Sequence, residues 1–206
     1  MSRDDGLPRP PPDLDRREPV IEVLPAGAML YRFHNRQYDP FHFDRSANAR
    51  FNAGNGHFGV MYAAVERRGA FAETFLRNVG STAISEALVG TKACSALRLR
   101  RPLRAVRFRG YGLAPIGATA SICSSPTYEA PQEWSRALHA HPQQMDAILY
   151  GSRHDDEQLC LAVFDRAKDA FAEPAIEHNL LDLKWFLDLM ELYWVGLLTT
   201  DDRGRP

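Results

Sequence analysis

Phe58-Gly-Val-Met-Tyr-Ala-Ala64 is the stretch that decides the fold, together with the helical pattern that follows it and ends near Arg77. The stretch is short, apolar and bounded by Gly56, which is typical of a buried β-strand. In the pattern that follows, apolar side chains recur at helical spacing, so one stripe of the helix would pack on a sheet. The sequence therefore predicts a strand–helix unit around which the rest of the chain is arranged.

Glu73 lies off this apolar stripe, on the helix face that it shares with Ala70 and Arg77. A surface carboxylate paired with Arg77 four residues later would contribute on the order of a few tenths of a kcal/mol. Charges on a helix face are usually solvated. Periodicity alone therefore favours a surface role for Glu73.

Composition indicates an ordinary soluble protein. At 206 residues, with 45% hydrophobic and 25% charged residues, the chain can bury a substantial core. Its formal net charge of -1 argues against a dedicated nucleic-acid binder. No run of about 18 apolar residues occurs, and the N-terminus lacks the apolar segment of a signal peptide. Three cysteines far apart suggest a reducing compartment, so we expect a cytoplasmic protein without membrane contact.

The chain divides into a leader, one domain and a tail. Residues 1–18 are rich in Pro, Asp and Arg, which predicts a disordered leader of open role. A single domain is expected over residues 19–198, followed by a flexible tail over residues 199–206. Between residues 34 and 57 the chain is polar and bears glycines, which predicts a long loop that is functional or disordered.

The remaining elements follow from periodicity and turn residues. The helix over residues 179–198 is strongly apolar but interrupted by charges, so we expect it to pack in the core or to support a homodimer. Further strands are predicted over residues 20–24, 29–33, 96–109 (two strands joined at Pro102), 145–151 and 159–164, and further helices over residues 84–90 and 128–140.

Arginines alternate with apolar residues between Ala96 and Arg109, forming a basic stripe. Such a stripe could contact nucleic acid, the phosphates of NAD or an acidic partner. More often it is the solvated face of an edge strand, where charge blocks unwanted pairing. We favour the edge strand, while the role of the stripe stays open.

Two other polar patterns give weak signals. His139 and His141 form a His-x-His pair without a third ligand at a metal-site spacing, so a helix C-terminus that favours histidines explains them better. Ser152 lacks a Gly-x-Ser-x-Gly context, so a hydrolase nucleophile is not supported, and a turn serine that bonds the local backbone is expected.

Several segments, taken in order, resemble the RES domain family, the toxins of bacterial toxin–antitoxin pairs. The family is named for an arginine, a glutamate and a serine, and the resemblance places them at Arg32, Glu73 and Ser152. Arg50 and Tyr62 are implied as further pocket residues. The matching segments are Leu30–Phe33, Ala49–Asn52, Gly59–Ala64 with Ala70–Glu73, Tyr128–Trp134, Asp146–Arg153 and Leu161–Phe164.

The resemblance implies an α+β fold similar to ADP-ribosyltransferases of the diphtheria-toxin type, with a mixed or antiparallel sheet core and flanking helices. It also implies NAD as substrate, with no metal. Such enzymes break the bond between nicotinamide and ribose, through a transition state that resembles an oxocarbenium ion. A carboxylate near the ribose stabilises this positive charge, and Glu73 is the expected one.

The other implied roles follow from residue chemistry. Arg32 and Arg50 would bind the diphosphate through charge-assisted hydrogen bonds. Tyr62 would stack on the nicotinamide ring. Ser152 would donate a hydrogen bond to the carboxamide or bond a ribose hydroxyl, and it is not assigned as a nucleophile.

Three classes of function follow. The first is an NAD-consuming toxin that acts as a glycohydrolase, as a phosphorylase or, alternatively, as a mono-ADP-ribosyltransferase; the sequence does not show the acceptor. The second is a non-catalytic module that binds a nucleotide or partner, and retention of the Arg, Tyr, Glu and Ser types argues against it. The third is a nucleic-acid binder, which the near-neutral charge disfavours. A toxin of this family is expected to meet a small helix-turn-helix antitoxin that blocks the pocket entrance.

Overall fold

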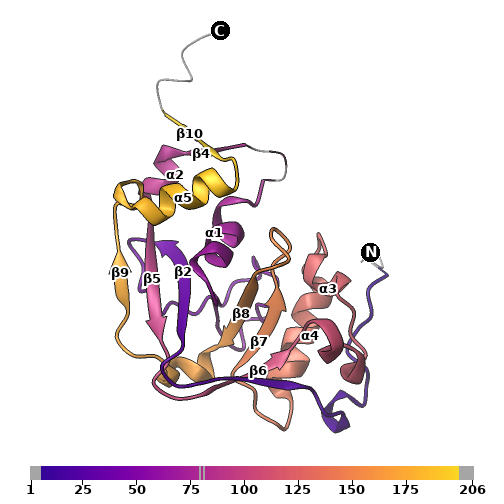
Figure 1. Cartoon of the computed structure of the whole chain (residues 1–206). Coiled ribbons are helices and arrows are strands. Elements are labelled where there is room, and N and C mark those ends of the chain that lie inside the picture. Colours follow the sequence, from indigo (N-terminus) through magenta and orange to yellow (C-terminus); the bar gives the residue numbers. More distant parts are fainter. Residues whose placement is uncertain (1–5, 79, 81, 200–206) are drawn as a thin grey trace.

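The computed structural model describes residues 6–78, 80 and 82–199 of the chain. Over these residues the chain forms a large mixed sheet with helices beside it (Figure 1). The strands are β1 (Ile21–Leu24), β2 (Met29–Asn35), β3 (Val60–Ala64), β4 (Ala83–Ser85), β5 (Lys92–Arg98), β6 (Leu103–Arg107), β7 (Ala147–Gly151), β8 (Leu159–Phe164), β9 (Ala175–Glu177) and β10 (Gly196–Leu198). The α-helices are α1 (Arg67–Phe75), α2 (Glu86–Gly90), α3 (Ser121–Ser124), α4 (Glu129–Ala140) and α5 (Lys184–Leu192).

The large sheet has the strand order β1-β6-β7-β8-β3-β2-β5-β9, and β10 pairs with β4 in a separate small sheet. Its neighbours run antiparallel except β6 and β7, which are parallel. Side chains alternate between its two faces, as the period-two patterns require. One face packs against the helices that carry Phe71, Trp134 and Phe186, whereas Met61 and Leu161 belong to a second core on the other face.

The sheet is divided between β2 and β3. These two strands pair only at Tyr31 and Ala64, whereas β2 pairs with β5 from Met29 to Asn35. Beyond their single pair, β2 and β3 separate. Helix α1 follows β3 directly and packs against both strands. The division therefore places the start of α1 beside a gap in the ladder.

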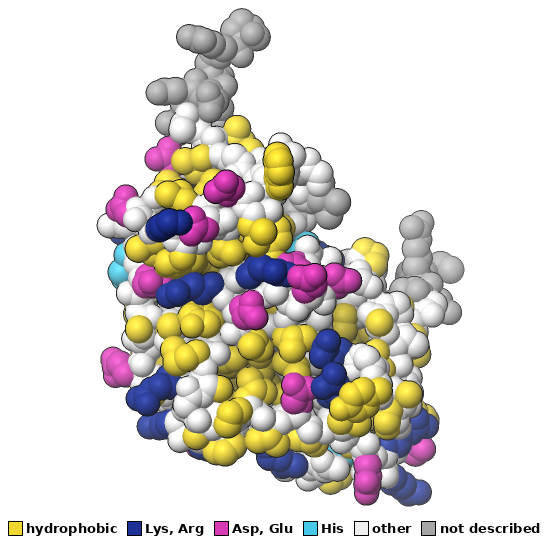
Figure 2. Space-filling model, in the orientation of Figure 1, with side chains coloured by type: hydrophobic (Ala, Val, Ile, Leu, Met, Phe, Trp, Pro, Cys, Tyr) yellow, Lys and Arg dark blue, Asp and Glu magenta, His cyan; other side chains and the backbone are white. Residues whose placement is uncertain are grey.

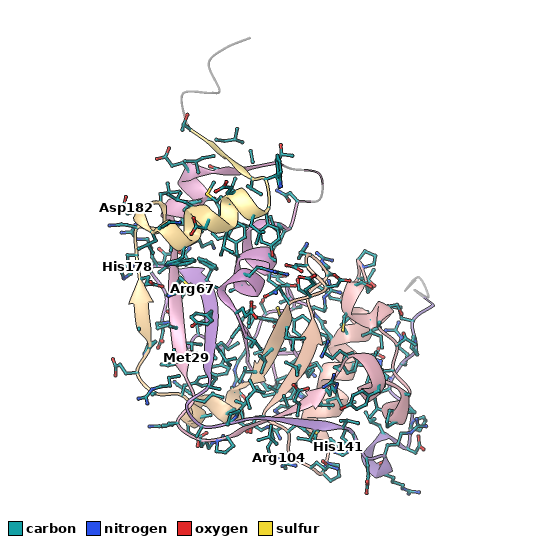
Figure 3. All side chains as sticks on the ribbon, viewed as in Figure 1. Met29, Arg67, Arg104, His141, His178 and Asp182 are labelled. Atoms are coloured by element: carbon teal, nitrogen blue, oxygen red, sulfur yellow. The ribbon has the colours of Figure 1, made fainter. Side chains whose placement is uncertain are left out.

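The start of α1 is fixed by Arg67, which is labelled in Figure 3. The guanidinium carbon of Arg67 lies 5.1 Å from the ring centroid of Tyr31 and 4.5 Å from that of Trp185. Its Nη2 also forms an ion pair of 2.8 Å with Glu177. Residues from β2, β9 and α5 thus hold α1 against the sheet.

The predicted strand–helix unit is present, with β3 from Val60 to Ala64 and α1 ending at Phe75, two residues before the expected end. Phe71 and Phe75 are buried, which confirms the apolar stripe. Glu66 precedes the helix in an extended conformation without a side-chain cap. Packing of the apolar stripe, together with Arg67, therefore positions this helix in place of a cap.

Residues 6–18 have fixed contacts, in place of the disordered leader that the sequence predicts. The indole nitrogen of Trp134 donates to the carbonyl oxygen of Pro8 at 2.8 Å. Leu14 is buried, and Nε2 of His141 lies 3.1 Å from its carbonyl oxygen. Composition predicted disorder because it ignores α4, which supplies both the apolar surface and the hydrogen-bond donors. Residues 1–5 lie outside the described part of the chain.

The long C-terminal helix is a wrong prediction. A short 3-10 helix (Leu180–Asp182) precedes α5, which ends at Leu192, and β10 follows. Trp194 has a φ of 54°, a left-handed conformation that ends the helix and turns the chain toward β4. Phe186 and Met190 are buried, which supports the core role of α5, and the homodimer stays a prediction. The expected tail lies outside the described residues from residue 200 onward.

The edge-strand interpretation of the basic stripe is also wrong. β5 lies between β2 and β9, and β6 lies between β1 and β7. Arg101 pairs with Asp146 at 3.1 Å and with Asp169 at 2.8 Å, and Arg107 pairs with Glu22 at 2.8 Å. Figure 2 shows basic and acidic side chains interspersed over the visible face. The arginines therefore project from inner strands, and several of them pair with neighbouring carboxylates.

Among the described residues, none of the helices combines the length and the apolar character that crossing a bilayer requires.

Candidate active site

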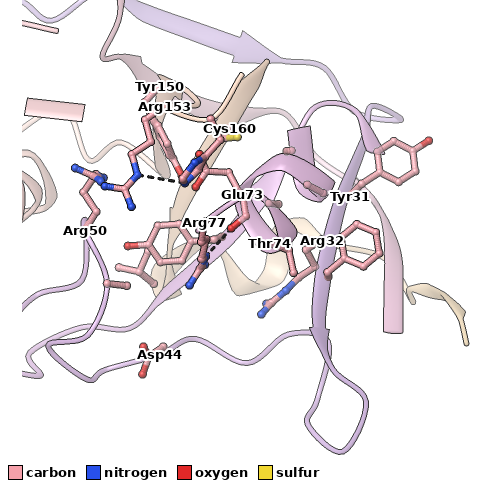
Figure 4. A pocket seen from close by; sticks show the side chains of 18 of the residues that line it. Tyr31, Arg32, Asp44, Arg50, Glu73, Thr74, Arg77, Tyr150, Arg153 and Cys160 are labelled. Atoms are coloured by element: carbon pink, nitrogen blue, oxygen red, sulfur yellow. Dashed lines mark hydrogen bonds between the residues drawn. The ribbon is translucent and has the colours of Figure 1, made fainter. Parts of the chain in front are cut away.

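A cavity of about 340 Å³ lies where β2 and β3 separate (Figure 4). Its wall is built from β2, β3, α1, the long segment between β2 and β3, the start of α4 and the connection between β7 and β8. The charged and aromatic residues of this wall include Tyr31, Arg32, His42, Asp44, Arg50, Tyr62, Glu73, Arg77, Tyr128, Tyr150, Arg153 and His154. Four of the five residues predicted for the site, Arg32, Arg50, Tyr62 and Glu73, thus line one cavity.

Glu73 presents an unpaired carboxylate oxygen to this cavity. Its Oε1 is buried and has no hydrogen-bond partner among the described residues. The Nε of Arg77 donates to the backbone carbonyl of Glu73 at 2.7 Å, so the expected helix-surface pair does not engage the carboxylate. A buried carboxylate oxygen without a donor is costly, and such a group is commonly completed by a ligand or water. Glu73 is therefore available to a bound molecule.

Arg32 lines the cavity from β2. Its Nη1 donates to the carbonyl oxygens of Pro40 at 2.9 Å and of His42 at 3.3 Å. Its Nε is buried and has no hydrogen-bond partner among the described residues. Burial lowers the pKa of Arg32 to about 10, so the guanidinium stays charged at neutral pH. The side chain is thus fixed by backbone carbonyls while part of its donor set remains unused.

Arg50 comes from the segment between β2 and β3. Its Nη1 donates to the carbonyl oxygen of Ser125 at 2.8 Å, and its guanidinium carbon lies 5.6 Å from the ring centroid of Tyr128. Burial, and then the positive charge of Arg153, lower the pKa of Arg50. In Figure 4, Arg50 and Arg32 lie on opposite sides of Glu73. The two guanidinium groups therefore flank the carboxylate.

Tyr62 connects β3 to the segment that carries Arg50. Its hydroxyl accepts a hydrogen bond from the backbone N–H of Phe51 at 2.8 Å and donates to Oδ1 of Asn52 at 3.1 Å. Burial raises the pKa of Tyr62 well above its ordinary value, so the phenol stays neutral. The hydroxyl thus positions Arg50, a role that the sequence does not reveal. Stacking of the ring on nicotinamide stays a prediction.

Ser152 is not among the residues that line the cavity. It is buried, its N–H donates to the carbonyl oxygen of Gln158 at 2.9 Å, and its Oγ accepts the N–H of His154 at 3.1 Å. These bonds are those of a turn serine. The structure therefore separates Ser152 from the other four predicted residues and gives it an ordering role in the connection between β7 and β8.

Arg153 and His154, which follow Ser152, line the cavity although the sequence did not single them out. The Nε of Arg153 donates to Nε2 of His154 at 3.2 Å. Because an arginine can only donate, a neutral His154 carries its proton on Nδ1. Burial lowers the pKa of His154, so the ring is neutral at pH 7. The only sequence signal for Arg153 was its place in a segment that resembles the family.

The connection between β7 and β8 is anchored to two helices. Nε of Arg68, in the first turn of α1, donates to Oδ2 of Asp155 at 2.9 Å, and the hydroxyl of Tyr193, just after α5, donates to the same oxygen. Burial alone would raise the pKa of Asp155, but the hydrogen bonds from Tyr193 and Arg68 hold it below its ordinary value. Arg153 and His154 are therefore placed by a charged contact rather than left on a free loop.

The cavity is basic overall. Its wall carries four arginines (Arg32, Arg50, Arg77 and Arg153) against two carboxylates (Asp44 and Glu73). Guanidinium groups bind phosphates through forked pairs of hydrogen bonds, so the wall suits a ligand that carries phosphate groups. Within residues 6–78, 80 and 82–199, no group of three or more His, Cys, Asp or Glu side chains is placed to hold a metal ion.

Comparisons with known proteins agree with this geometry. The model of the family described as RES domain matches residues 29–185. A curated relative, "Probable toxin y4kH" of Sinorhizobium fredii (strain NBRC 101917 / NGR234), is 31% identical over 88 residues, which cover 43% of this chain and 68% of the relative.

A solved structure gives the fold. The crystal structure of the M. tuberculosis MbcT–MbcA toxin–antitoxin complex contains a chain that superposes with a TM-score of 0.61 at 13% identity. The match covers 82% of the present chain and 92% of that chain. At this identity the likeness bears on the fold alone. It confirms the predicted α+β class, an ADP-ribosyltransferase-like mixed sheet with flanking helices.

Proposed function

Because this chain belongs to the RES domain family, we propose that it is a toxin that consumes NAD by cleaving the bond between nicotinamide and ribose. The observation that carries the proposal is the buried, unpartnered oxygen of Glu73 inside a cavity lined by arginines. A carboxylate in that setting is suited to a substrate that brings both a developing positive charge and phosphates. NAD has both.

Glu73 would act on the ribose. When the bond between C1′ and the pyridinium nitrogen breaks, the electron pair moves to the ring nitrogen and neutral nicotinamide leaves. The ribose then carries an oxocarbenium-like positive charge, which the nearby carboxylate stabilises without forming a bond. The acceptor supplies the new bond to C1′: water gives ADP-ribose and a proton, and inorganic phosphate gives the phosphorylated sugar.

Arg32 and Arg50 would bind the diphosphate. The Nη1 of each arginine already donates to backbone carbonyl oxygens, which fixes the guanidinium before substrate arrives. A preorganised charge loses little free energy to reorganisation during the reaction. The other N–H groups of these arginines suit binding of the diphosphate rather than bond cleavage. Replacing either arginine should therefore raise KM more than it lowers kcat.

The toxin role is supported by the names of similar proteins. One relative is named a probable toxin, and the fold is shared with a chain from a toxin–antitoxin complex. We infer that the partner is an antitoxin, of the helix-turn-helix kind expected from the sequence, that covers the mouth of the cavity. Co-expression of such a partner should relieve growth arrest caused by this chain.

Product identification tests the proposal. The purified protein is incubated with NAD, with and without inorganic phosphate, and the products are separated and weighed by mass spectrometry. We expect free nicotinamide together with ADP-ribose or its phosphorylated form. A labelled polypeptide would instead favour the mono-ADP-ribosyltransferase.

The matched variants are Glu73→Gln and Glu173→Gln. The second glutamate is exposed and does not line the cavity, so its variant controls for the loss of one charge. We expect Glu73→Gln alone to lose nicotinamide release, by about a hundredfold or more. Equal release by both variants would remove Glu73 from the mechanism.

A further inference from the structure

Asp44 is a second carboxylate in the cavity wall, and the mechanism above does not use it. We propose that Asp44 makes the cavity select NAD, with its free ribose 2′-hydroxyl, and reject NADP, with its 2′-phosphate. This inference rests on the proposed function, because it assumes that the cavity binds a nicotinamide dinucleotide.

The carboxylate of Asp44 is held in place. Its Oδ1 accepts the N–H of Ser46 at 2.9 Å, and its Oδ2 accepts the hydroxyl of Ser46 and the amide of Asn52, each at 2.8 Å. Its backbone N–H and carbonyl both pair with Val60 of β3, at 2.9 and 3.0 Å. Asp44 therefore cannot turn away from an incoming ligand without breaking several bonds.

The carboxylate of Asp44 stays ionised at neutral pH. Burial alone would raise the pKa of Asp44, but hydrogen bonds from Ser46 and Asn52 outweigh it and hold the pKa below its ordinary value. Asp44 forms no ion pair with another described residue. The adjacent Arg45 is engaged with Asp165 at 2.6 Å. A full negative charge thus faces the ligand at neutral pH.

The place of Asp44 fits the adenosine half of the dinucleotide. In Figure 4, Asp44 lies well apart from Glu73, on the segment that also carries Arg50. In this view Arg77 lies between Glu73 and Asp44. If Glu73 meets the ribose that loses nicotinamide and the arginines of the wall meet the diphosphate, the second ribose lies at the part of the cavity away from Glu73, and the carboxylate of the wall at that distance is Asp44.

The chemistry of the two ligands differs at this point. A carboxylate offers about four lone-pair positions, and three are occupied here, so one remains for a ribose hydroxyl. A 2′-phosphate brings a charge of about -1.5 to -2 and only accepts hydrogen bonds at neutral pH. Dinucleotide sites elsewhere use an acidic side chain on the 2′-hydroxyl for the same selection.

Calorimetric binding of NAD and NADP tests the inference, with nicotinamide release measured on the same samples. We expect wild type to bind NADP about a hundredfold more weakly than NAD. In Asp44→Asn, NAD should bind a few times more weakly, while the ratio between the two ligands falls by about tenfold.

Ser46→Ala is the matched control. It removes one hydrogen bond to Asp44 but keeps the negative charge. If Asp44 only supports the loop, both variants should change NAD and NADP binding in parallel. We expect the ratio to persist in Ser46→Ala and to shrink in Asp44→Asn.

Three outcomes would overturn the inference: equal affinities in wild type, an unchanged ratio in Asp44→Asn, or no binding of either ligand. The last also overturns the proposed function. Binding of NAD without nicotinamide release would overturn the proposed function alone, because the two affinities would still decide the selection by Asp44.

Discussion

The two walls of the cavity are built in different ways. The wall that carries Glu73 is β3 and α1, where Phe71 is fully buried and its ring centroid lies 5.1 Å from that of Phe75 and 5.5 Å from that of Phe186. The wall that carries Arg50 is the segment between β2 and β3, which contains no helix or strand beyond an isolated bridge at Asp44. Apolar packing holds the first wall, whereas the second combines the fully buried ring of Phe51, which lies 5.0 Å from that of Tyr150, with many hydrogen bonds from its backbone.

Helix α4 provides four of those hydrogen bonds. Nε2 of Gln132 donates to the carbonyl oxygens of Ala47 and Ala49 at 2.9 and 3.0 Å. The Oγ of Ser135 donates to the carbonyl oxygen of Phe51 at 2.5 Å. Nη1 of Arg136 donates to the carbonyl oxygen of Ala53 at 2.7 Å. The three donors follow each other at helical spacing on one face of α4. The Arg50 wall thus takes its shape from a helix about eighty residues away.

Glu73 and Arg50 are therefore held in place by separate sets of contacts. Loss of apolar packing under α1 should unfold the protein, because that packing belongs to the core. Loss of a hydrogen bond to the Arg50 wall should leave the fold intact and weaken substrate binding. Three substitutions can break or sharpen the comparison.

Phe71→Ala should have the largest effect on stability. The side chain is fully buried, and its removal leaves a cavity in the aromatic cluster under α1, so unfolding should become easier by about 3–5 kcal/mol. Urea denaturation monitored by circular dichroism measures the change. A loss comparable with that of an exposed substitution such as Leu187→Ala would show that α1 does not depend on this packing.

Tyr62→Phe should have a smaller effect on stability and a specific effect on binding. The change leaves the buried N–H of Phe51 without its acceptor, which costs about 1–3 kcal/mol, and it frees the segment that carries Arg50. We expect KM for NAD to rise more than kcat falls. Tyr111→Phe, at an exposed tyrosine outside the cavity, should leave both constants at their wild-type values. A fall in kcat with KM unchanged would instead favour direct contact of Tyr62 with the reacting ribose.

His139 contacts the end of the segment that carries Arg50, at Phe58, shortly before β3 begins. His139 lies in the last turn of α4 and His141 directly after it, as the sequence predicts. The ring of His139 stacks on that of Phe58 at 3.9 Å, and Nε2 of His141 lies 3.1 Å from the carbonyl oxygen of Leu14, so both rings also have packing or hydrogen-bond partners. Burial, and then the charge of Arg166, lower the pKa of His139 from 6.5 to about 4.

The sign of the pH effect follows from this lowered pKa. Between pH 6.5 and about 4, the unfolded chain binds a proton at His139 that the folded chain does not, so stability falls as pH falls through this window. His139→Phe keeps a stacked ring and removes this part of the dependence. Urea denaturation at about pH 7 and about pH 5 compares the two proteins. The same loss of stability in both would show that His139 does not contribute.

Much of the fold could be predicted from the sequence because it rests on local patterns. The unit of β3 and α1, the strands β2, β7 and β8, and helix α4 all carry the expected periodicity. The α+β class followed from the resemblance. For the site, periodicity alone favoured a surface role for Glu73, and the resemblance assigned it to the pocket, where α1 carries it to the cavity.

The rest depended on contacts between distant residues. The leader is ordered by Trp134, more than a hundred residues later, and a composition argument has no access to that partner. Trp194 ends the last helix through a left-handed conformation that no propensity predicts for tryptophan. In the site, the role of the Tyr62 hydroxyl and the entry of Arg153 into the wall, with Ser152 left outside it, follow from three-dimensional hydrogen bonds.

The most direct test separates binding from bond cleavage in Glu73→Gln. Gln keeps the size of the side chain but removes the negative charge that would face the ribosyl cation. The affinity for NAD, measured by calorimetry, should stay within a few fold of wild type, while single-turnover release of nicotinamide should fall by about a hundredfold or more. Release at the wild-type rate, from a variant that binds NAD normally, would contradict the central claim that this carboxylate stabilises the oxocarbenium-like transition state.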